Sequence, residues 1–221
     1  AATMLRTLRQ APALWREIPA HLADAALRVA TLDASAVEAA VQARGGPPEF
    51  LSVDARLDRI VQRVAKFRVQ PTLAPALGWL AAHRPPAPER RCLVHGDLGP
   101  TNLMVRDGDL VAVLDWSKAL LAEPEAEVGF LRVSIRTAAV SGLGRWNRPL
   151  GRVLARVAER VTARYRAPRP LDPERMRWYE TLRAVGLLAS IVKRRKPGKQ
   201  RSHILDGRSA EQALAGELAV A

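Results

Sequence analysis

The chain has few features that would place it outside the cell or in a membrane. It contains one cysteine, Cys92, so an internal disulfide is excluded, and the thiol is predicted to be buried on a strand. Its longest apolar stretch, 184–192, is too short to cross a bilayer. The sequence does not open with a charged segment followed by an apolar one, as a secretory leader would. These absences together predict a cytoplasmic protein with no membrane partner.

The composition is that of a globular domain with a strong positive charge. Hydrophobic residues make up 48% of 221 residues, enough to bury the core of a single domain, 1–221. The formal net charge of +13 favours anionic partners such as nucleotides or phosphorylated substrates. The densest basic run, 193–201, is interpreted first as a solvated loop after a helix end, because cations stabilise helix C-termini. We therefore do not expect nucleic acid as a partner.

The most informative stretch of the chain is LVHGDLGPTNLMVRDGDLVAVLDW, residues 93–116. It places His95, Asp97 and Asn102 at the spacing His-x-Asp-x-x-x-x-Asn, and Asp115 follows an apolar run. Chance alone would produce His-Gly-Asp-x-x-x-x-Asn in roughly one chain in a thousand of this length. The spacing is typical of a phosphoryl-transfer loop. In such a loop one Asp orients and deprotonates a hydroxyl, while an Asn and a second Asp hold magnesium.

A β-hairpin is predicted to bring these groups together. Apolar, β-prone runs flank Asp107-Gly108, a dipeptide that favours a two-residue hairpin turn. A regular hairpin around that turn pairs Asn102 with Val113 and puts Asp115 on a diagonal from Asn102, about 7 to 8 Å away. An amide oxygen and a carboxylate at that separation can share one hard cation, with phosphate completing its shell.

Other interpretations of these residues stay open at this stage. Asp97 and Asp115 could cap backbone amides, as Asp does in many turns. For His95, hydrogen bonding that orients the loop is the favoured role over direct chemistry. Trp116 is expected to pack in the core beside the metal site.

The segment LVHGDLGPTNLMVRDGDLVAVLDWSKALLAEPEAEVGFL resembles the catalytic and metal-binding segment of the aminoglycoside phosphotransferase-like family, which has a protein-kinase fold. The sequence of this segment is most similar to that of the phosphotransferase domains associated with acyl-CoA dehydrogenases. The resemblance implies Asp97 as the catalytic base with His95 beside it. It also implies Asn102 and Asp115 as the residues that hold Mg2+ and, through it, the cofactor ATP. The implied reaction is ATP- and Mg2+-dependent phosphoryl transfer to a small-molecule hydroxyl.

Two acids after the metal motif depart from the family pattern. Where the family reads Gly-Asp-Pro, residues 122–124 read Ala-Glu-Pro, and Glu127 replaces the Asp that opens the next helix. In the kinase fold this second acid braces the backbone of the catalytic loop. The extra methylene of Glu127 is expected to make the brace looser.

The segment before Arg91 lacks the features of a kinase small lobe. It has no run of strands and no glycine-rich loop, and its only lysine, Lys66, lies in a helical pattern. Such enzymes need a lysine on a strand to hold the α- and β-phosphates. The chain therefore resembles a large lobe without its small lobe. Because it begins with Ala1 rather than Met, it suits a fragment, although a complete protein that has lost the lobe remains an alternative.

The expected fold is α+β and predominantly helical: a kinase-like C-lobe with a small catalytic hairpin. Three parts are expected: a helical segment 1–90, the loop and hairpin 91–116, and a helical segment 117–221. Periodicity and capping signals predict the individual helices. These are Leu5–Ile18, Ala20–Leu32, one opened by Ser35 and stopped by Gly45-Gly46, Asp54–Phe67, Thr72–His83, Glu125–Val140, Leu150–Tyr165, Pro173–Val192 and one opened by Ser209.

Two function classes follow from these observations. The first is a phosphotransferase whose acceptor is neutral or anionic. Arginines such as Arg132, Arg136 and Arg177 face few acids in the sequence and would repel a polycationic aminoglycoside. The second is a catalytically inactive kinase-like remnant or binding module that engages an anionic partner. The retained motif favours the enzyme and the missing lobe favours the remnant. In either case the chain alone should have negligible activity.

Overall fold

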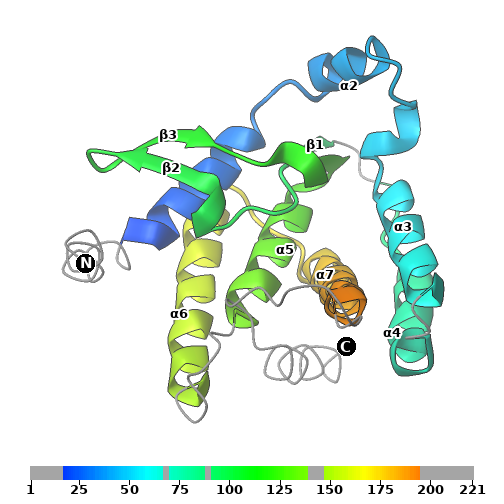
Figure 1. Cartoon of the computed structure of the whole chain (residues 1–221). Coiled ribbons are helices and arrows are strands. Elements are labelled where there is room, and N and C mark those ends of the chain that lie inside the picture. Colours follow the sequence, from blue (N-terminus) through cyan, green and yellow to red (C-terminus); the bar gives the residue numbers. More distant parts are fainter. Residues whose placement is uncertain (1–16, 67–69, 88–90, 139–146, 195–221) are drawn as a thin grey trace.

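The computed structural model describes residues 17–66, 70–87, 91–138 and 147–194, and most of them are helical (Figure 1). A helical segment, 17–29, comes first. The helices that follow it are α2 (Ala34–Gln42), α3 (Val53–Lys66), α4 (Gln70–Ala82), α5 (Pro124–Arg136), α6 (Asn147–Arg166) and α7 (Pro173–Arg194). Three 3-10 turns are η1 (Pro48–Leu51), η2 (Pro100–Asn102) and η3 (Trp116–Lys118). The predicted predominantly helical fold is confirmed.

The helix ends show where local signals were decisive. The N-cap of α2 is Asp33, whose carboxylate accepts the N–H of Ser35 and Ala36 at 2.9 and 3.3 Å, so the predicted cap at Ser35 was two residues late. The predicted stop is confirmed, with Gly45 at φ +76°, three residues after the last helical residue, Gln42. Three other predictions lie wholly or largely outside the described residues: the helix 5–18, the basic run after Arg194 and the helix from Ser209.

Four short strands form two antiparallel pairs. β1 (Cys92–Val94) pairs with β4 (Leu120–Ala122), and every residue of both strands is buried. The predicted burial of Cys92 on a strand is therefore confirmed. β2 (Leu103–Arg106) pairs with β3 (Asp109–Val113) and forms the hairpin that projects from the helical body (Figure 1).

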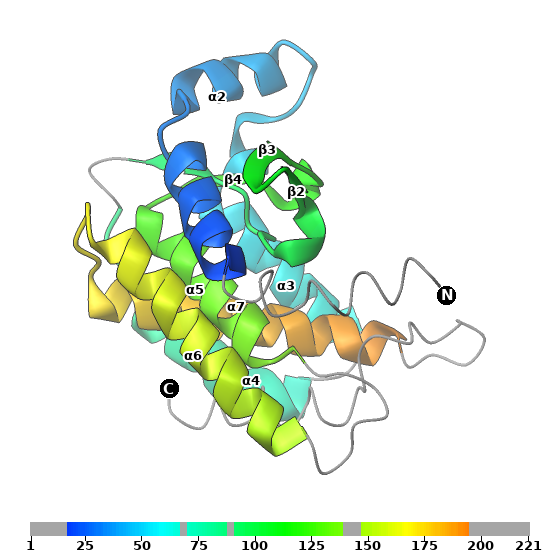
Figure 2. The ribbon, with the colours of Figure 1, turned by 90° about the vertical axis from the view of Figure 1, so that its left-hand side faces the viewer.

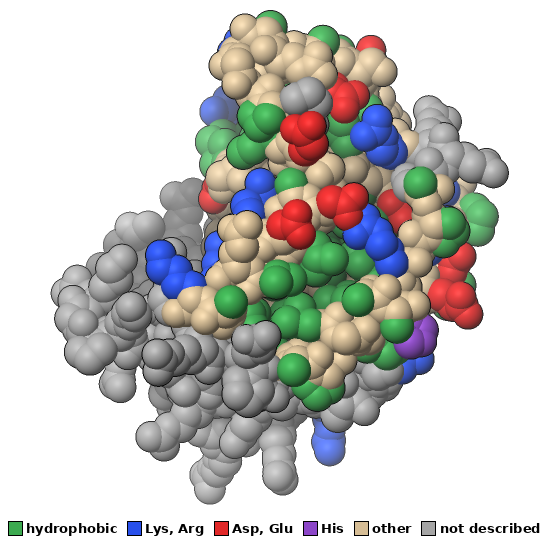
Figure 3. Space-filling view, turned by 90° about the vertical axis from the view of Figure 1, so that its right-hand side faces the viewer, with side chains coloured by type: hydrophobic (Ala, Val, Ile, Leu, Met, Phe, Trp, Pro, Cys, Tyr) green, Lys and Arg blue, Asp and Glu red, His purple; other side chains and the backbone are tan. Residues whose placement is uncertain are grey.

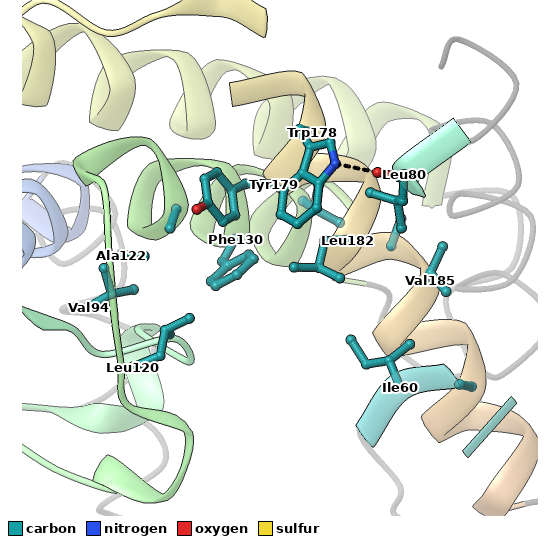
Figure 4. Packing of buried hydrophobic residues seen from close by; sticks show 14 of the residues in the cluster. Ile60, Leu80, Val94, Leu120, Ala122, Phe130, Trp178, Tyr179, Leu182 and Val185 are labelled. Atoms are coloured by element: carbon teal, nitrogen blue, oxygen red, sulfur yellow. Dashed lines mark hydrogen bonds between the residues drawn. The ribbon is translucent and has the colours of Figure 1, made fainter. Parts of the chain in front are cut away.

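Helix α5 lies at the centre of the molecule because it is apolar on more than one face. It packs against α7 and α6; in Figure 2, α6 runs alongside α5 and α7 crosses behind it. Phe130 of α5 meets Tyr179 of α7 edge to face, with ring centroids 5.6 Å apart (Figure 4). Gly129 allows this close approach, since a Cβ there would lie 3.0 Å from the Cβ of Tyr179.

A second set of contacts joins the early helices to the same core. Both α3 and α4 pack against α7. The buried Trp178 of α7 donates its indole N–H to the carbonyl oxygen of Leu80 at 2.9 Å (Figure 4).

Figure 3 shows hydrophobic side chains beside acidic and basic ones on the opposite face of the molecule from the hairpin.

The described residues before Arg91 contain helices and turns but no strand. Lys66 is the last residue of α3, as the helical pattern predicted. The architecture is therefore that of a kinase-like fold without a full small lobe. No helix in the described part of the chain has the length and apolar character needed to cross a membrane.

Candidate active site

The turn of the hairpin forms as predicted, but the pairing register of its two strands differs from the prediction. Asp107 and Gly108 have φ of 53° and 88°, the left-handed values that a two-residue hairpin turn requires. Further along, β3 contains one residue more than β2, because Val111 is an unpaired bulge between the partners of Val105 and Met104.

Because of this bulge, the residue that pairs with Val113 is not the one that the sequence predicted. Leu103, not Asn102, pairs with Val113, and the carbonyl oxygen of Asn102 accepts the N–H of Leu114 at 2.8 Å. The pairing of Asn102 with Val113 was therefore wrong by one residue. Residues 110–114 are all apolar, so the sequence pattern gives no sign of which residue is the bulge.

The loop after β1 depends on a glycine. Gly96 has φ +75°, and a Cβ built on it would lie 2.2 Å from the carbonyl oxygen of Lys118. A side chain there would be both strained and without space. The motif glycine thus lets the chain turn sharply between His95 and Asp97 while η3 packs against it.

Glu127, in the first turn of α5, braces this loop. Its Oε2 accepts the backbone N–H of His95 and, at 3.3 Å, the N–H of Gly96. Burial raises the pKa of Glu127 to about 7, although the two N–H donors and the guanidinium of Arg56 lower it. The extra methylene does not keep the carboxylate from these amides, so the expected looser brace is not what the contacts show.

His95 is completely buried and ties the loop to the end of the hairpin. Its Nε2 lies 2.9 Å from the carbonyl oxygen of Leu114, and its Nδ1 accepts the N–H of Asp97 at 3.3 Å. Burial lowers the pKa of His95, so the neutral ring with the proton on Nε2 fits both contacts. This geometry suits an orienting role for His95.

Trp116 packs beside His95 but not in the core. The two ring centroids are 4.8 Å apart in an edge-to-face arrangement, and the indole N–H donates to the carbonyl oxygen of Val113. Trp116 is 39% exposed, so the expected core position was wrong. The exposed indole lies directly after Asp115, at the surface of the site.

The carboxylate of Asp97 is held between two cations. Arg183 of α7 donates to Oδ1 at 2.6 Å, and the ammonium of Lys118 donates to Oδ2. Burial alone would raise the pKa of Asp97, but Arg183 and Lys118 outweigh it and keep the pKa below its usual range. Asp97 is therefore ionised at neutral pH, and it can position a hydroxyl more readily than it can accept a proton in the ground state.

Two arginines that support this loop were missed by sequence reasoning. Arg183 is 8% exposed and also donates to the Ser134 hydroxyl at 2.9 Å and the Gly96 carbonyl at 3.3 Å. Arg56 of α3 donates to the carbonyls of Gly96 and Lys118 at 3.1 and 2.9 Å. A charged residue inside an apolar helix could have drawn attention to Arg183. Arg56 is one of several arginines on α3 and had no such signal.

Asn102 lies against the catalytic loop at the end of η2. Its Nδ2 donates to the backbone carbonyl of Asp97 at 2.9 Å. Because the nitrogen is used in this way, the oxygen of the amide is the atom that could face a cation.

Asp115 begins η3 in a left-handed conformation, φ 59° and ψ 69°. One carboxylate oxygen accepts the hydroxyl and N–H of Ser117, at 2.6 and 3.4 Å. These bonds lower the pKa of Asp115. Asp115 therefore does cap a backbone amide, as the alternative interpretation predicted, and the cap occupies one of its two carboxylate oxygens. A non-glycine residue held in this conformation is often found at a functional site.

The donor set fits a hard divalent cation only in part. The amide oxygen of Asn102 and a carboxylate oxygen of Asp115 are ligand types that Mg2+ accepts. In the described ranges no three His, Cys, Asp or Glu side chains gather at one point. Two protein ligands require further oxygens from phosphates or water, which is the usual arrangement of Mg2+ with a nucleotide.

The fold and the loop together define a kinase-like phosphotransferase lobe. The model of the phosphotransferase enzyme family matches residues 3–179, so the chain belongs to this family. Hygromycin-B 4-O-kinase of Escherichia coli is 37% identical over 67 residues, 30% of this chain and 20% of that enzyme.

Two solved structures share the fold. A thermostable mutant of aminoglycoside phosphotransferase APH(4)-Ia, in its apo form, has a TM-score of 0.51 at 20% identity over 94% of this chain and 65% of that one. A protein of Ralstonia eutropha JMP134, provisionally assigned as an aminoglycoside phosphotransferase, has a TM-score of 0.59 at 21% identity over 92% and 64%. The chain thus spans less than two thirds of the length of these proteins.

Proposed function

We propose that residues 1–221 form the large lobe of an enzyme that transfers the γ-phosphoryl group of ATP to a small-molecule hydroxyl, with Mg2+ as cofactor and in the cytoplasm. The observation that carries this proposal is the setting of Asp97. Its carboxylate is ionised and oriented by Arg183, and its backbone is tied to Asn102. The Asp97 side chain is partly exposed, so an acceptor hydroxyl could reach it.

Each residue of the motif has a distinct task in this reaction. Asp97 orients the acceptor hydroxyl and takes its proton as the oxygen attacks the γ-phosphorus. His95 and Glu127 keep the loop backbone in place through the contacts described above. Asn102 and Asp115 would hold Mg2+ on the phosphates. The bound ion would neutralise negative charge on the transferred group.

The acceptor proposed for this site is neutral or anionic. Arg132 and Arg136 face few acids in the sequence, but both form ion pairs with Glu180, at 2.6 and 3.1 Å. These two arginines therefore do not supply the repulsion that the sequence predicted. The positive charge near Asp97 comes instead from Lys118, Arg183 and the partly buried Arg56. A polycationic aminoglycoside would approach three cations there.

A second candidate is a binding module without catalysis. It is favoured by the front of the chain, where the described residues before Arg91 supply no strand and no lysine on a strand. A kinase-like site without that lysine holds nucleotide poorly. Such a module would use the basic residues of the site to bind an anionic partner.

Two measurements separate the candidates. The first is the coding sequence upstream of this chain: an in-frame, strand-rich segment with a lysine supports the enzyme. The second is a phosphotransfer assay of the protein so extended against a panel of alcohols, hydroxy acids and aminoglycosides, with Asp97→Asn as the inactive control. A product that gains one phosphoryl group with the wild type but not with the variant supports the proposal. Binding of nucleotide with no product from any acceptor contradicts it and favours the module.

A further inference from the structure

The two cations on Asp97 are held in different ways. The guanidinium of Arg183 is buried and has three acceptors: Asp97, Ser134 and the Gly96 carbonyl. It cannot leave one of them without losing the others. Arg183 is therefore a fixed part of the site.

Lys118 has the opposite character. Its side chain is 48% exposed, and among the described residues its ammonium pairs only with Asp97 Oδ2. Its backbone, in contrast, is fixed, because Arg56 binds its carbonyl oxygen at 2.9 Å and Gly96 packs against the same atom. A long flexible side chain on a rigid anchor can change partner at low cost, since a half-exposed ion pair contributes little to stability.

The position of Lys118 also suits a phosphoryl group. It ends η3, three residues after Asp115, and its ammonium reaches the carboxylate that meets the acceptor hydroxyl. Of the five lysines of the chain, Lys118 alone lies between Arg91 and Val192, which include the whole motif. An ammonium at this point is close to the expected position of the transferred phosphoryl group, whose negative charge it could stabilise.

We propose that Lys118 is a catalytic residue that exchanges partners: it pairs with Asp97 in the empty site and turns to the γ-phosphoryl group of the nucleotide during transfer. This inference rests on the proposed function. In the step, the acceptor oxygen forms a bond to the γ-phosphorus and the bond to the β,γ-bridging oxygen breaks, leaving its electron pair on ADP. The hydroxyl proton passes to Asp97 Oδ2, which Lys118 has left. Lys118 itself neither gives nor takes a proton.

The exchange explains why a catalytic carboxylate is paired with two cations. While Lys118 is present, Oδ2 is occupied by its ammonium. When the ammonium moves away, Oδ2 becomes free to meet the acceptor hydroxyl, while Arg183 still holds Oδ1. The same movement brings a hydrogen-bond donor to the transferred oxygens.

The test compares two nucleotides that differ in the γ-phosphoryl group. Mg2+ with ADP and Mg2+ with the non-hydrolysable analogue AMP-PNP are titrated into the 15N-labelled chain, and affinities are measured by NMR, which detects millimolar binding. The proteins are the wild type, Lys118→Gln, Lys118→Arg and the matched control Lys66→Gln at an exposed site on α3. Thermal melts check that every variant is folded.

The expected result is selective. Lys118→Gln weakens AMP-PNP binding about tenfold, the loss of one charge-assisted hydrogen bond, and changes ADP binding less than twofold. Lys118→Arg retains most of the AMP-PNP affinity, and Lys66→Gln changes neither. Equal effects on both nucleotides, or no effect on either, overturn the role of Lys118 while leaving the proposed function intact. A wild type that binds neither nucleotide at millimolar concentration overturns the role of Lys118 in this chain, whereas the proposed function is decided separately by the phosphotransfer assay of the extended protein.

Discussion

At the scale of single residues, the contacts of Asp97 account for the ionised state of its carboxylate, which its position in the motif alone does not. Arg183 and Lys118 stabilise the carboxylate, while partial burial opposes its charge. The balance leaves an ionised, well-oriented acceptor. Such a group fits a loose phosphoryl-transfer transition state, in which positioning counts for more than basicity.

Removing Arg183 should alter Asp97 and destabilise the fold. In Arg183→Met the pKa of Asp97 should rise, because burial remains and one of the two opposing cations is lost. The unfolding free energy should fall by about 2 kcal/mol, since Ser134 and the Gly96 carbonyl also lose a charged donor. Carbon-13 NMR titration of the Asp97 carboxyl and urea unfolding measure the two effects. The exposed Arg152→Met on α6 serves as the control, and an unchanged pKa in Arg183→Met would contradict the assigned cause.

Glu127 should make stability depend on pH. Its folded pKa, about 7, is raised above the reference value of 4.5, so the folded state binds the proton more tightly than the unfolded state. The stabilisation is complete below pH 4.5 and is lost as the pH rises to 7. Relative to Glu127→Gln, the wild type should lose up to about 3 kcal/mol across this window, at 1.36 kcal/mol per pKa unit.

Urea unfolding of both proteins at several pH values measures the effect. Taking the difference between wild type and variant removes the opposite contribution of His95, whose pKa is lowered. Glu174→Gln, at an exposed site on α7, should run parallel to the wild type. Parallel curves for Glu127→Gln as well would show that Glu127 does not titrate in this range.

At the scale of elements, the site is assembled from the ends of several segments. The loop after β1 carries Asp97, η2 and η3 carry Asn102 and Lys118, and the first turn of α5 carries Glu127. The long helices α3 and α7 contribute only one arginine each, Arg56 and Arg183. The loop therefore depends on backbone contacts to several elements at once.

Gly96 should be the most sensitive glycine of the loop. Gly96→Ala places a methyl group 2.2 Å from the Lys118 carbonyl and at a positive φ, so the unfolding free energy should fall by at least about 3 kcal/mol. Gly99→Ala is the matched control, because its Cβ would meet nothing within 4 Å. Urea unfolding compares the two. Similar small losses would show that η3 can move away from the loop.

At the scale of the whole molecule, the described helices build the large lobe around α5 but supply no small lobe. We expect the purified 221-residue chain to have negligible phosphotransferase activity, because none of the lysines in the described ranges lies on a strand, where it could hold the α- and β-phosphates. ADP release in the presence of Mg2+, ATP and a panel of alcohols measures this. ATP turnover that Asp97→Ala abolishes would contradict the expectation and reveal a replacement for that lysine.

The charge of the site should select against cationic acceptors. Lys118 and Arg183 contact Asp97 directly, and Arg56 lies behind it, so a polycation would be repelled while a carboxylate or phosphate could gain a hydrogen bond. With the protein extended by any small lobe, neutral or anionic hydroxyl compounds should show higher kcat/KM than aminoglycosides. The reverse order, with aminoglycosides preferred, would defeat the charge argument.

The sequence alone determined the type of most elements and the content of the motif, because these depend on local pattern. Helical periodicity predicted α3, α4, α6 and α7 within a few residues, and Asp107-Gly108 predicted the hairpin turn. The spacing from His95 to Asn102 indicated a phosphoryl-transfer loop, and the resemblance of residues 93–131 to a phosphotransferase family is confirmed by the family model.

Only the tertiary structure decided how the motif is supported. With the bulge at Val111, Leu103 rather than Asn102 pairs with Val113. This register depends on packing that a sequence pattern does not record. Arg183 and Arg56 lie 86 and 40 residues or more from the loop residues they contact, so no local spacing could join them to it. Long-range ion pairs of this kind form only when helices pack, and they set the charge of Asp97, the property on which the proposed chemistry depends.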